Sequence, residues 1–269
     1  MTALTDGLLD DAAVFPPGLA PLPDAITAHD RHTAAWYAEM VGPLVIAASG
    51  LGELATLVRG RETPLPLAIT FPGGPDGIAP ALATVADLPV TVEMLEVAVP
   101  SGVGEFLSSI ADCPAPIAVE IPRDDRRIPL LQALSGTPYK AKFRTGGTSA
   151  EYYPDEAELA AAIRAAVEAG VPFKATAGLH HAIRNTDPTT GFEQHGFLNL
   201  LLATEAITRG EDAVDLLAER DGAAVAKHVA ALTPERLAAA RAQFTSFGTC
   251  SITDPLTELT DLGLIGAPA

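Results

Sequence analysis

The chain has few of the features that mark secreted or membrane-bound proteins. Its only cysteines are Cys113 and Cys250, so a framework of several disulfides is excluded. No apolar run reaches membrane-spanning length, and the amino terminus has no basic region followed by an apolar stretch. These absences favour the cytoplasm, where a disulfide between the two cysteines would be unusual.

Positive charge is also scarce. The chain has 17 lysine and arginine residues against 34 aspartate and glutamate residues, which gives a net charge of −17. Nucleic acids and anionic membranes require positive charge in their partners, so both are disfavoured. We therefore expect a small-molecule substrate as the partner, and metabolic enzymes often form homo-oligomers.

The order of apolar segments predicts an α/β fold with one domain over residues 1–269. Short β-branched runs alternate with longer alanine- and leucine-rich stretches, which is typical of repeated βα units. Strands are expected near residues 11–15, 43–48, 65–71, 90–97, 117–121, 139–145, 173–177 and 244–251. Helices are expected near residues 23–40, 51–59, 78–86, 104–111, 127–134 and 156–169.

Eight such units suggest a closed (β/α)8 TIM barrel. The alternative is an open doubly wound sheet, but the glycine-rich dinucleotide fingerprint of that fold is missing after the first strand. The segment 180–243 is far longer than one crossover needs. We therefore expect extra helices between strands seven and eight, near residues 197–208, 213–230 and 234–242.

Two short apolar runs that contain lysine, residues 139–147 and 171–178, are the most informative segments. Side chains alternate along a strand, and the apolar face of each run suits the outer helices. The polar residues of these runs, and one acid of the strand before them, should then point into the barrel: Lys140, Lys142, Arg144, Lys174, Thr176 and Glu120.

A lysine inside a barrel must pair with an acid or lose its proton. Glu93 and Glu96 lie on opposite faces of their predicted strand, and alternation does not decide which of them faces inward. Asp10 and Asp11 precede the first predicted strand, and their role is equally undecided. Structural ion pairs would explain any single one of these charges. Several inward cations favour an active site, because a desolvated amine near a second cation is a nucleophile suited to Schiff-base chemistry.

Three segments resemble, in the right order, class I deoxyribose-phosphate aldolase and related Schiff-base (β/α)8 aldolases. Residues 142–146, Lys-Phe-Arg-Thr-Gly, resemble the family's Lys-x-x-Thr-Gly strand. Residues 174–178 resemble the next strand, which carries a second lysine, and residues 247–251 resemble the last strand. Residues 92–94, Val-Glu-Met, are similar to the family's Val-Asp-Met.

The resemblance implies that Lys142 forms the Schiff base and that Lys174 lowers the pKa of its amine. Glu93 stands where the family has an aspartate that acts in proton transfer, and Glu120 is the alternative shuttle. Lys140 is a rival nucleophile or a substrate contact. The last strand would hold the phosphate of the substrate through Gly248, Thr249 and Ser251. Such chemistry requires neither a metal nor an organic cofactor.

The sequence also differs from that family at several positions within and after the two lysine-containing strands. Arg144 adds a fixed cation beside the supposed nucleophile, and Ala177 replaces a glycine. Leu-His-His at residues 179–181 replaces Ile-Arg after the second lysine. A changed rim loop implies a changed substrate, so deoxyribose phosphate itself is not expected.

The histidines after the seventh predicted strand are further candidates. We expect His180, His181, His195 and Asn199 to form hydrogen bonds with substrate at the rim, together with Thr176 and Gly178. A divalent metal is the alternative, although no HxH or HExxH pattern occurs. His29 and His32 lie on the first predicted helix and should be surface or packing residues.

The leading hypothesis is a lyase of the Schiff-base aldolase type that acts on a small, anionic or phosphorylated carbonyl compound. The alternative is a barrel isomerase, or a metal-assisted lyase or hydrolase, in which the lysines bind an anion and histidines or acids transfer protons. A barrel that binds a small molecule without chemistry is the third hypothesis.

Overall fold

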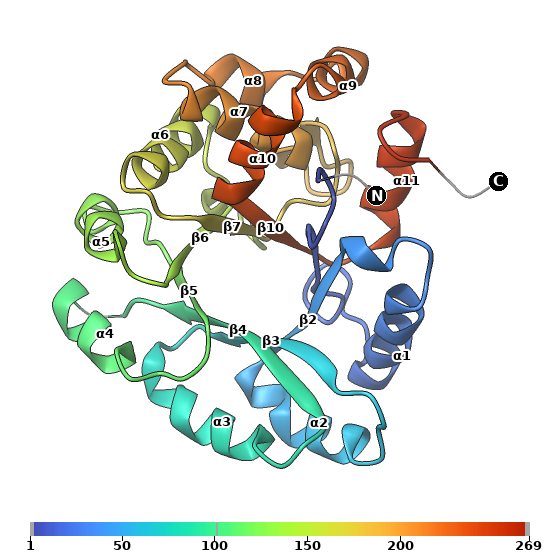
Figure 1. Cartoon of the computed structure of the whole chain (residues 1–269), viewed down its shortest axis with the longest axis vertical. Helices are drawn as coiled ribbons and strands as arrows, with labels where there is room; N and C mark the ends of the chain where they lie inside the picture. The colour runs from blue at the N-terminus through green and yellow to red at the C-terminus, as the bar shows by residue number, and fades with distance from the viewer. Residues whose placement is uncertain (1–2, 101, 267–269) are drawn as a thin grey trace.

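Eight parallel strands close into a barrel in a computed structural model that describes residues 3–100 and 102–266 (Figure 1). Their order around the barrel is β1-β10-β7-β6-β5-β4-β3-β2, which confirms the (β/α)8 fold. The strands are β1 (Leu9–Asp11), β2 (Val41–Ala47), β3 (Leu65–Phe71), β4 (Val90–Ala98), β5 (Ile117–Glu120), β6 (Lys140–Arg144), β7 (Phe173–Thr176) and β10 (Phe244–Thr249).

Helices surround the barrel in Figure 1. Six of them lie at the predicted places along the chain: α1 (Leu22–Thr33), α2 (Leu51–Val58), α3 (Ile78–Val85), α4 (Val103–Ile110), α5 (Arg127–Leu134) and α6 (Glu156–Glu168). The first is shorter than the predicted 23–40, because the chain leaves the helix after Thr33 and forms a separate 3-10 turn at Ala38–Met40. Helix α6 was predictable because residues at both of its ends are typical of helix termini. The side chain of Asp155 accepts a hydrogen bond from the Glu158 backbone at its start, and Gly170 ends it with a φ of 66°.

The segment between β7 and β10 holds the expected extra helices. They are α7 (Phe197–Thr208), α8 (Val214–Ala218), α9 (Gly222–Ala230) and α10 (Pro234–Gln243). The predicted helix over 213–230 is two helices, because Asp221 caps the start of α9 and interrupts the run. A small hairpin of β8 (Asn185–Thr186) and β9 (Glu193–Gln194) precedes them and was not predicted.

Two further elements differ from the sequence pattern. Strand β1 is Leu9–Asp11 and not 11–15, because the Phe15 amide donates to the Ala12 carbonyl and the chain turns there. Helix α11 (Thr253–Asp261) was not predicted, since its run of threonine and aspartate has low helix propensity. Within the described part of the chain, no helix combines the length and apolar character needed to cross a bilayer.

Candidate active site

The centre of the barrel contains two lysines that share one carboxylate. Lys142 of β6 and Lys174 of β7 are register partners, so their side chains stand next to each other. Lys142 Nζ lies 2.8 Å from Glu96 Oε2, and the amine of Lys174 contacts the other oxygen of Glu96. The three residues are only 4%, 2% and 2% exposed, respectively. Glu96 of β4 therefore bridges two amines that water barely reaches.

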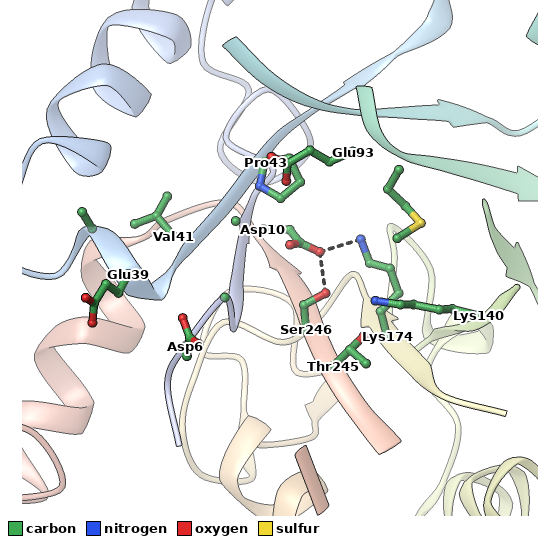
Figure 2. A pocket seen from close by; sticks show the side chains of 14 residues that line it. Asp6, Asp10, Glu39, Val41, Pro43, Glu93, Lys140, Lys174, Thr245 and Ser246 are labelled. Carbon is green, nitrogen blue, oxygen red and sulfur yellow. Dashed lines mark hydrogen bonds and ion pairs between the residues drawn. The ribbon is translucent and has the colours of Figure 1, made fainter. Parts of the chain in front are cut away.

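Asp10 of β1 is the second acid that Lys174 contacts. Lys174 Nζ lies 2.6 Å from Asp10 Oδ2, and the Ser246 hydroxyl donates to the same oxygen at 2.8 Å (Figure 2). Gly42 leaves room for this carboxylate, because a Cβ at that position would lie 2.4 Å from Asp10 Oδ1. Asp11 points the other way, outside the barrel, and lies 3.0 Å from His29 of α1. Asp10, whose role the sequence left open, thus belongs to the site.

From Lys142 the ion pairs continue toward the carboxyl ends of the strands. Glu120 Oε2 lies 3.0 Å from Lys142 Nζ, and Glu120 Oε1 accepts a hydrogen bond from Arg144 Nε at 3.3 Å. The Arg144 guanidinium also lies over the Tyr152 ring, 5.6 Å from its centre. The side chains of Glu120 and Arg144 are 23% and 35% exposed. The cluster therefore begins in the core and reaches solvent at the end where barrel enzymes hold substrate.

These contacts set the charge states of the cluster. Burial alone would raise the pKa of Glu96, but the positive charges of Lys142 and Lys174 lower it to about 2. Burial opposes the charge on Lys174, yet Asp10 and Glu96 raise the pKa of its ammonium above the ordinary value. Likewise, burial would raise the pKa of Glu120, and Lys142 and Arg144 lower it. Burial keeps the pKa of Asp10 raised despite Lys174. Lys174 is thus a fixed cation, and Glu96 a fixed anion.

Glu93 is not the acid beside the lysines, and the placement expected from the family resemblance is corrected. Strand β4 carries a bulge, since Val92 pairs with Leu67 and Met94 with Ala68 of β3, so Glu93 is an extra residue. The bulge reverses the alternation after it and turns Glu96 inward. Glu93 is exposed and lies near the amino end of its strand, where burial and Asp10 raise the pKa of its carboxyl.

Lys140 lies one layer away from Lys142, at the start of β6. It is half-buried, and burial lowers the pKa of its amine, with Lys174 and Arg241 acting in the same direction and the charge of Asp10 opposing them. No ion pair within 4 Å joins Lys140 to an acid among the described residues. Its position places it at the end of the barrel opposite to Arg144.

His180 and His181 follow β7 at the carboxyl end but turn to different partners. His180 Nδ1 lies 3.3 Å from the Cys250 sulfur, and burial lowers the pKa of this imidazole. His181 Nδ1 lies 2.6 Å from a Glu258 oxygen, and this hydrogen bond raises the pKa of His181. The described residues contain no group of three or more His, Cys, Asp or Glu side chains arranged to hold a metal ion.

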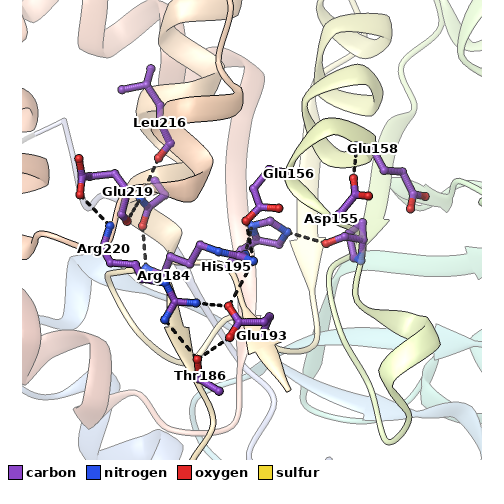
Figure 3. A network of polar contacts seen from close by, with 12 residues as sticks. Asp155, Glu156, Glu158, Arg184, Thr186, Glu193, His195, Leu216, Glu219 and Arg220 are labelled. Atoms are coloured by element: carbon purple, nitrogen blue, oxygen red, sulfur yellow. Dashed lines mark hydrogen bonds and ion pairs between the residues drawn. The ribbon is translucent and has the colours of Figure 1, made fainter. Parts of the chain in front are cut away.

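His195 lies in a scaffold of hydrogen bonds with Arg184 (Figure 3), and Asn199 belongs to the same scaffold. His195 is fully buried; its Nε2 donates to the Pro154 carbonyl at 2.8 Å, and its Nδ1 accepts from Arg184 at 3.2 Å. Asn199 accepts from the Arg184 backbone and donates to two carbonyls, those of Leu216 and Glu219. Every polar atom of both side chains is used internally, so both residues hold the loop after β7 in place.

The remaining predicted contacts lie at the carboxyl ends of β7 and β10. Thr176 is the register partner of both Arg144 and Gly248, so these three residues share one rim. Gly178 has a φ of 72°, and a Cβ there would lie 3.0 Å from the Thr145 carbonyl, so only glycine fits. The hydroxyl of Thr249 is buried and donates to the Ser251 carbonyl at 2.9 Å. The rim therefore places Thr176 and backbone groups beside Arg144, whereas the Thr249 hydroxyl is committed within the protein.

Comparison with protein-family models and with curated proteins finds no match to this chain. The closed barrel and its cluster of charges therefore carry the functional argument. Barrels of this type build their active sites from strand ends and the loops after them, which is where Glu120 and Arg144 reach solvent. The architecture is accordingly suited to an enzyme.

Proposed function

We propose that the protein is a lyase of the Schiff-base aldolase type, which acts on a small anionic carbonyl compound through Lys142. The observation that carries the proposal is the pair of buried amines on neighbouring strands, bridged by the single carboxylate of Glu96. Two buried lysines in one barrel are an unusual cost to stability unless they serve chemistry. Their positions on β6 and β7 also agree with the aldolase family that the sequence resembles.

The roles of the two lysines follow from their partners. Lys174 has two anions against its ammonium and a raised pKa, so it acts as a charge and not as a nucleophile. Lys142 is then the attacking amine. Its nitrogen adds to the substrate carbonyl carbon, and loss of water gives an iminium ion. Loss of the proton from the substrate hydroxyl then cleaves the adjacent carbon–carbon bond, which releases an aldehyde and leaves the electron pair in an enamine. Protonation of the enamine carbon restores an iminium ion, and water hydrolyses it to release the second product and the free amine.

Glu120 is the proton carrier that suits this sequence of steps. It lies 3.0 Å from the Lys142 amine and is partly exposed, so it can contact both the nucleophile and a bound substrate. Glu96 has a pKa of about 2, so it stays ionised and stabilises the positive charge of the iminium. Glu93 does not suit this role, because it lies near the amino end of β4, away from Lys142. The bulge in β4 turns Glu96, and not Glu93, toward the lysines.

An anionic group on the substrate would bind Arg144. The guanidinium lies at the rim with 35% of its side chain exposed, and Glu120 and Tyr152 hold it in place. Thr176 and the backbone after Gly248 stand on the neighbouring strands and complete the anion site. This arrangement supports a carboxylate or phosphate as the second functional group of the substrate.

The test is reduction with borohydride in the presence of small aldehydes, ketones and sugar phosphates, followed by intact-mass measurement. We expect a stable adduct with one class of anionic carbonyl compound. Lys142→Arg keeps the positive charge between Glu96 and Glu120 but cannot form an iminium, so it should show no adduct. Lys140→Arg is the matched control on the same strand and should react as the unmodified protein does.

One observation favours the alternative, a barrel isomerase without a covalent intermediate. Lys142 is paired with two carboxylates, which suits a cation that binds an anion while Glu120 transfers a proton. That function predicts turnover of an anionic carbonyl compound without a borohydride adduct. It also predicts that Lys142→Arg keeps part of the activity, whereas the aldolase would lose all of it.

A further inference from the structure

A cavity opens at the opposite end of the barrel from the proposed active site. Its volume is about 390 Å³, within the range of small-molecule sites. Figure 2 shows its floor, formed by Asp10, Lys174 and Ser246, and its walls, which include Lys140 and Glu93. Lys140 is the first residue of β6 and Arg144 the last, so the cavity and the rim lie on opposite sides of Lys142.

The cavity exposes a cation that lacks an acidic partner. Lys140 points toward the centre of the cavity in Figure 2, and no ion pair within 4 Å is found for it in the described residues. Arg241 adds positive charge nearby; its guanidinium donates to the carbonyls of Phe244 and Asp6, and burial lowers its pKa to about 10. Asp10 favours the Lys140 ammonium only from a distance beyond an ion pair, so a ligand carboxylate in direct contact would stabilise it further.

The same cavity exposes an acid that lacks a cation. Glu93 lines the wall, and within the described segments no hydrogen bond or ion pair joins its carboxylate to a neighbour. Burial of part of the side chain and the nearby Asp10 raise the pKa of Glu93, although the residue remains exposed to solvent. Asp6 and Glu39 add further negative charge to the lining. An ammonium group on a ligand would supply the missing partner.

We infer that this cavity binds a small zwitterion, an amino-acid-like compound that carries one carboxylate and one ammonium group. Its carboxylate lies on Lys140, and its ammonium lies on Glu93. Thr245 and Ser246 also line the cavity, but their hydroxyls already donate to the Phe173 carbonyl and to Asp10. At about 30 Å³ for each water-sized group, the volume holds roughly a dozen non-hydrogen atoms. A zwitterion matches both unpaired charges at once, whereas a ligand with one charge leaves the other unpaired.

Binding there would also act on the lysine cluster. The floor of the cavity is the Asp10–Lys174 ion pair, and Lys174 contacts Glu96, which contacts Lys142. A ligand that competes for Asp10 or Lys174 would alter the charge beside Lys142. This consequence for catalysis rests on the proposed function, but the binding itself does not.

The test is calorimetric titration of the whole protein with glycine, β-alanine and 4-aminobutyrate at millimolar concentrations. Propionate and propylamine serve as ligands with a single charge. We expect at least one zwitterion to bind, and both single-charge compounds to bind about tenfold more weakly or not at all, as the loss of a charge-assisted hydrogen bond requires. Lys140→Met and Glu93→Gln should each weaken binding by a similar factor, while Lys227→Met on the surface of α9 should not change it.

Two results would overturn the inference. If no zwitterion binds, the cavity has no such ligand; if propionate or propylamine binds as tightly as the zwitterions, one charge suffices. Unchanged affinity in both Lys140→Met and Glu93→Gln would place the binding elsewhere. Circular dichroism of each variant verifies that it is folded. Because no borohydride adduct is measured, failure here leaves the proposal for Lys142 intact, and the reverse also holds.

Discussion

Replacing Glu96 with glutamine tests whether the shared carboxylate holds the core of the barrel together. The change keeps the size of the side chain but removes the anion that contacts both Lys142 and Lys174. In wild type the pKa of Glu96 falls from 4.5 to about 2, a difference that corresponds to about 3 kcal/mol of stability. In other proteins, removing one member of a buried ion pair lowers the free energy of unfolding by a similar amount, about 3–5 kcal/mol.

The contribution of Glu96 to the free energy of unfolding should depend on pH. A carboxyl whose pKa is lower in the folded state contributes stability that is complete above pH 4.5 and is lost as pH falls toward about 2. We expect Glu96→Gln to be about 3 kcal/mol less stable than wild type at pH 7 in urea unfolding, and about 6–12 °C lower in its melting temperature. The difference between the two proteins should shrink as pH falls below 4.5.

Glu93→Gln is the matched control, since Glu93 lies on the same strand but is exposed. It should change the unfolding free energy by no more than about 0.5 kcal/mol. If Glu96→Gln were as stable as Glu93→Gln at pH 7, the shared carboxylate would not stabilise the core of the barrel. The same conclusion would follow if the difference from wild type stayed constant down to pH 3, because the carboxylate would then contribute nothing.

Other variants test the scaffold around the site. Gly42→Ala would place a Cβ 2.4 Å from Asp10 Oδ1, so we expect a loss of about 1–3 kcal/mol in urea unfolding, whereas Gly52→Ala, with no atom within 4 Å, should gain about 0.5–1 kcal/mol. Equal stability of these two alanine variants would contradict the packing of Asp10. Burial lowers the pKa of His195, so its contribution is present above pH 6.5 and is lost as pH falls below that value. His195→Gln should therefore lie closer to wild type in unfolding free energy at pH 5.5 than at pH 7.5, and a constant difference would show that His195 is not held neutral.

Much of the barrel was predictable because its elements have strong local signals. The helix over Glu156–Glu168 begins at a capping aspartate and ends at Gly170, and both signals were visible in the sequence. Alternation alone placed Lys142 and Lys174 inside the barrel, which their contacts with Glu96 confirm. The strand order followed from the number of repeating units.

The partners of the lysines were not predictable in the same way. The bulge at Glu93 reverses the alternation of its strand, and no residue type in the sequence signals it. Asp10 joins the site because its strand begins two residues earlier than the apolar pattern indicates. His195 looked like a rim residue, but a buried hydrogen bond with Pro154, distant in the sequence, decides its role.

The role of Lys142 can be decided by peptide mapping of the protein after borohydride reduction with the carbonyl compound that gives an adduct. We expect a single modified peptide that contains Lys142, with no modification in Lys142→Arg and full modification in Lys140→Arg. An adduct on Lys174 or Lys140, or turnover of an anionic carbonyl compound with no adduct on any lysine, would contradict the Schiff base on Lys142.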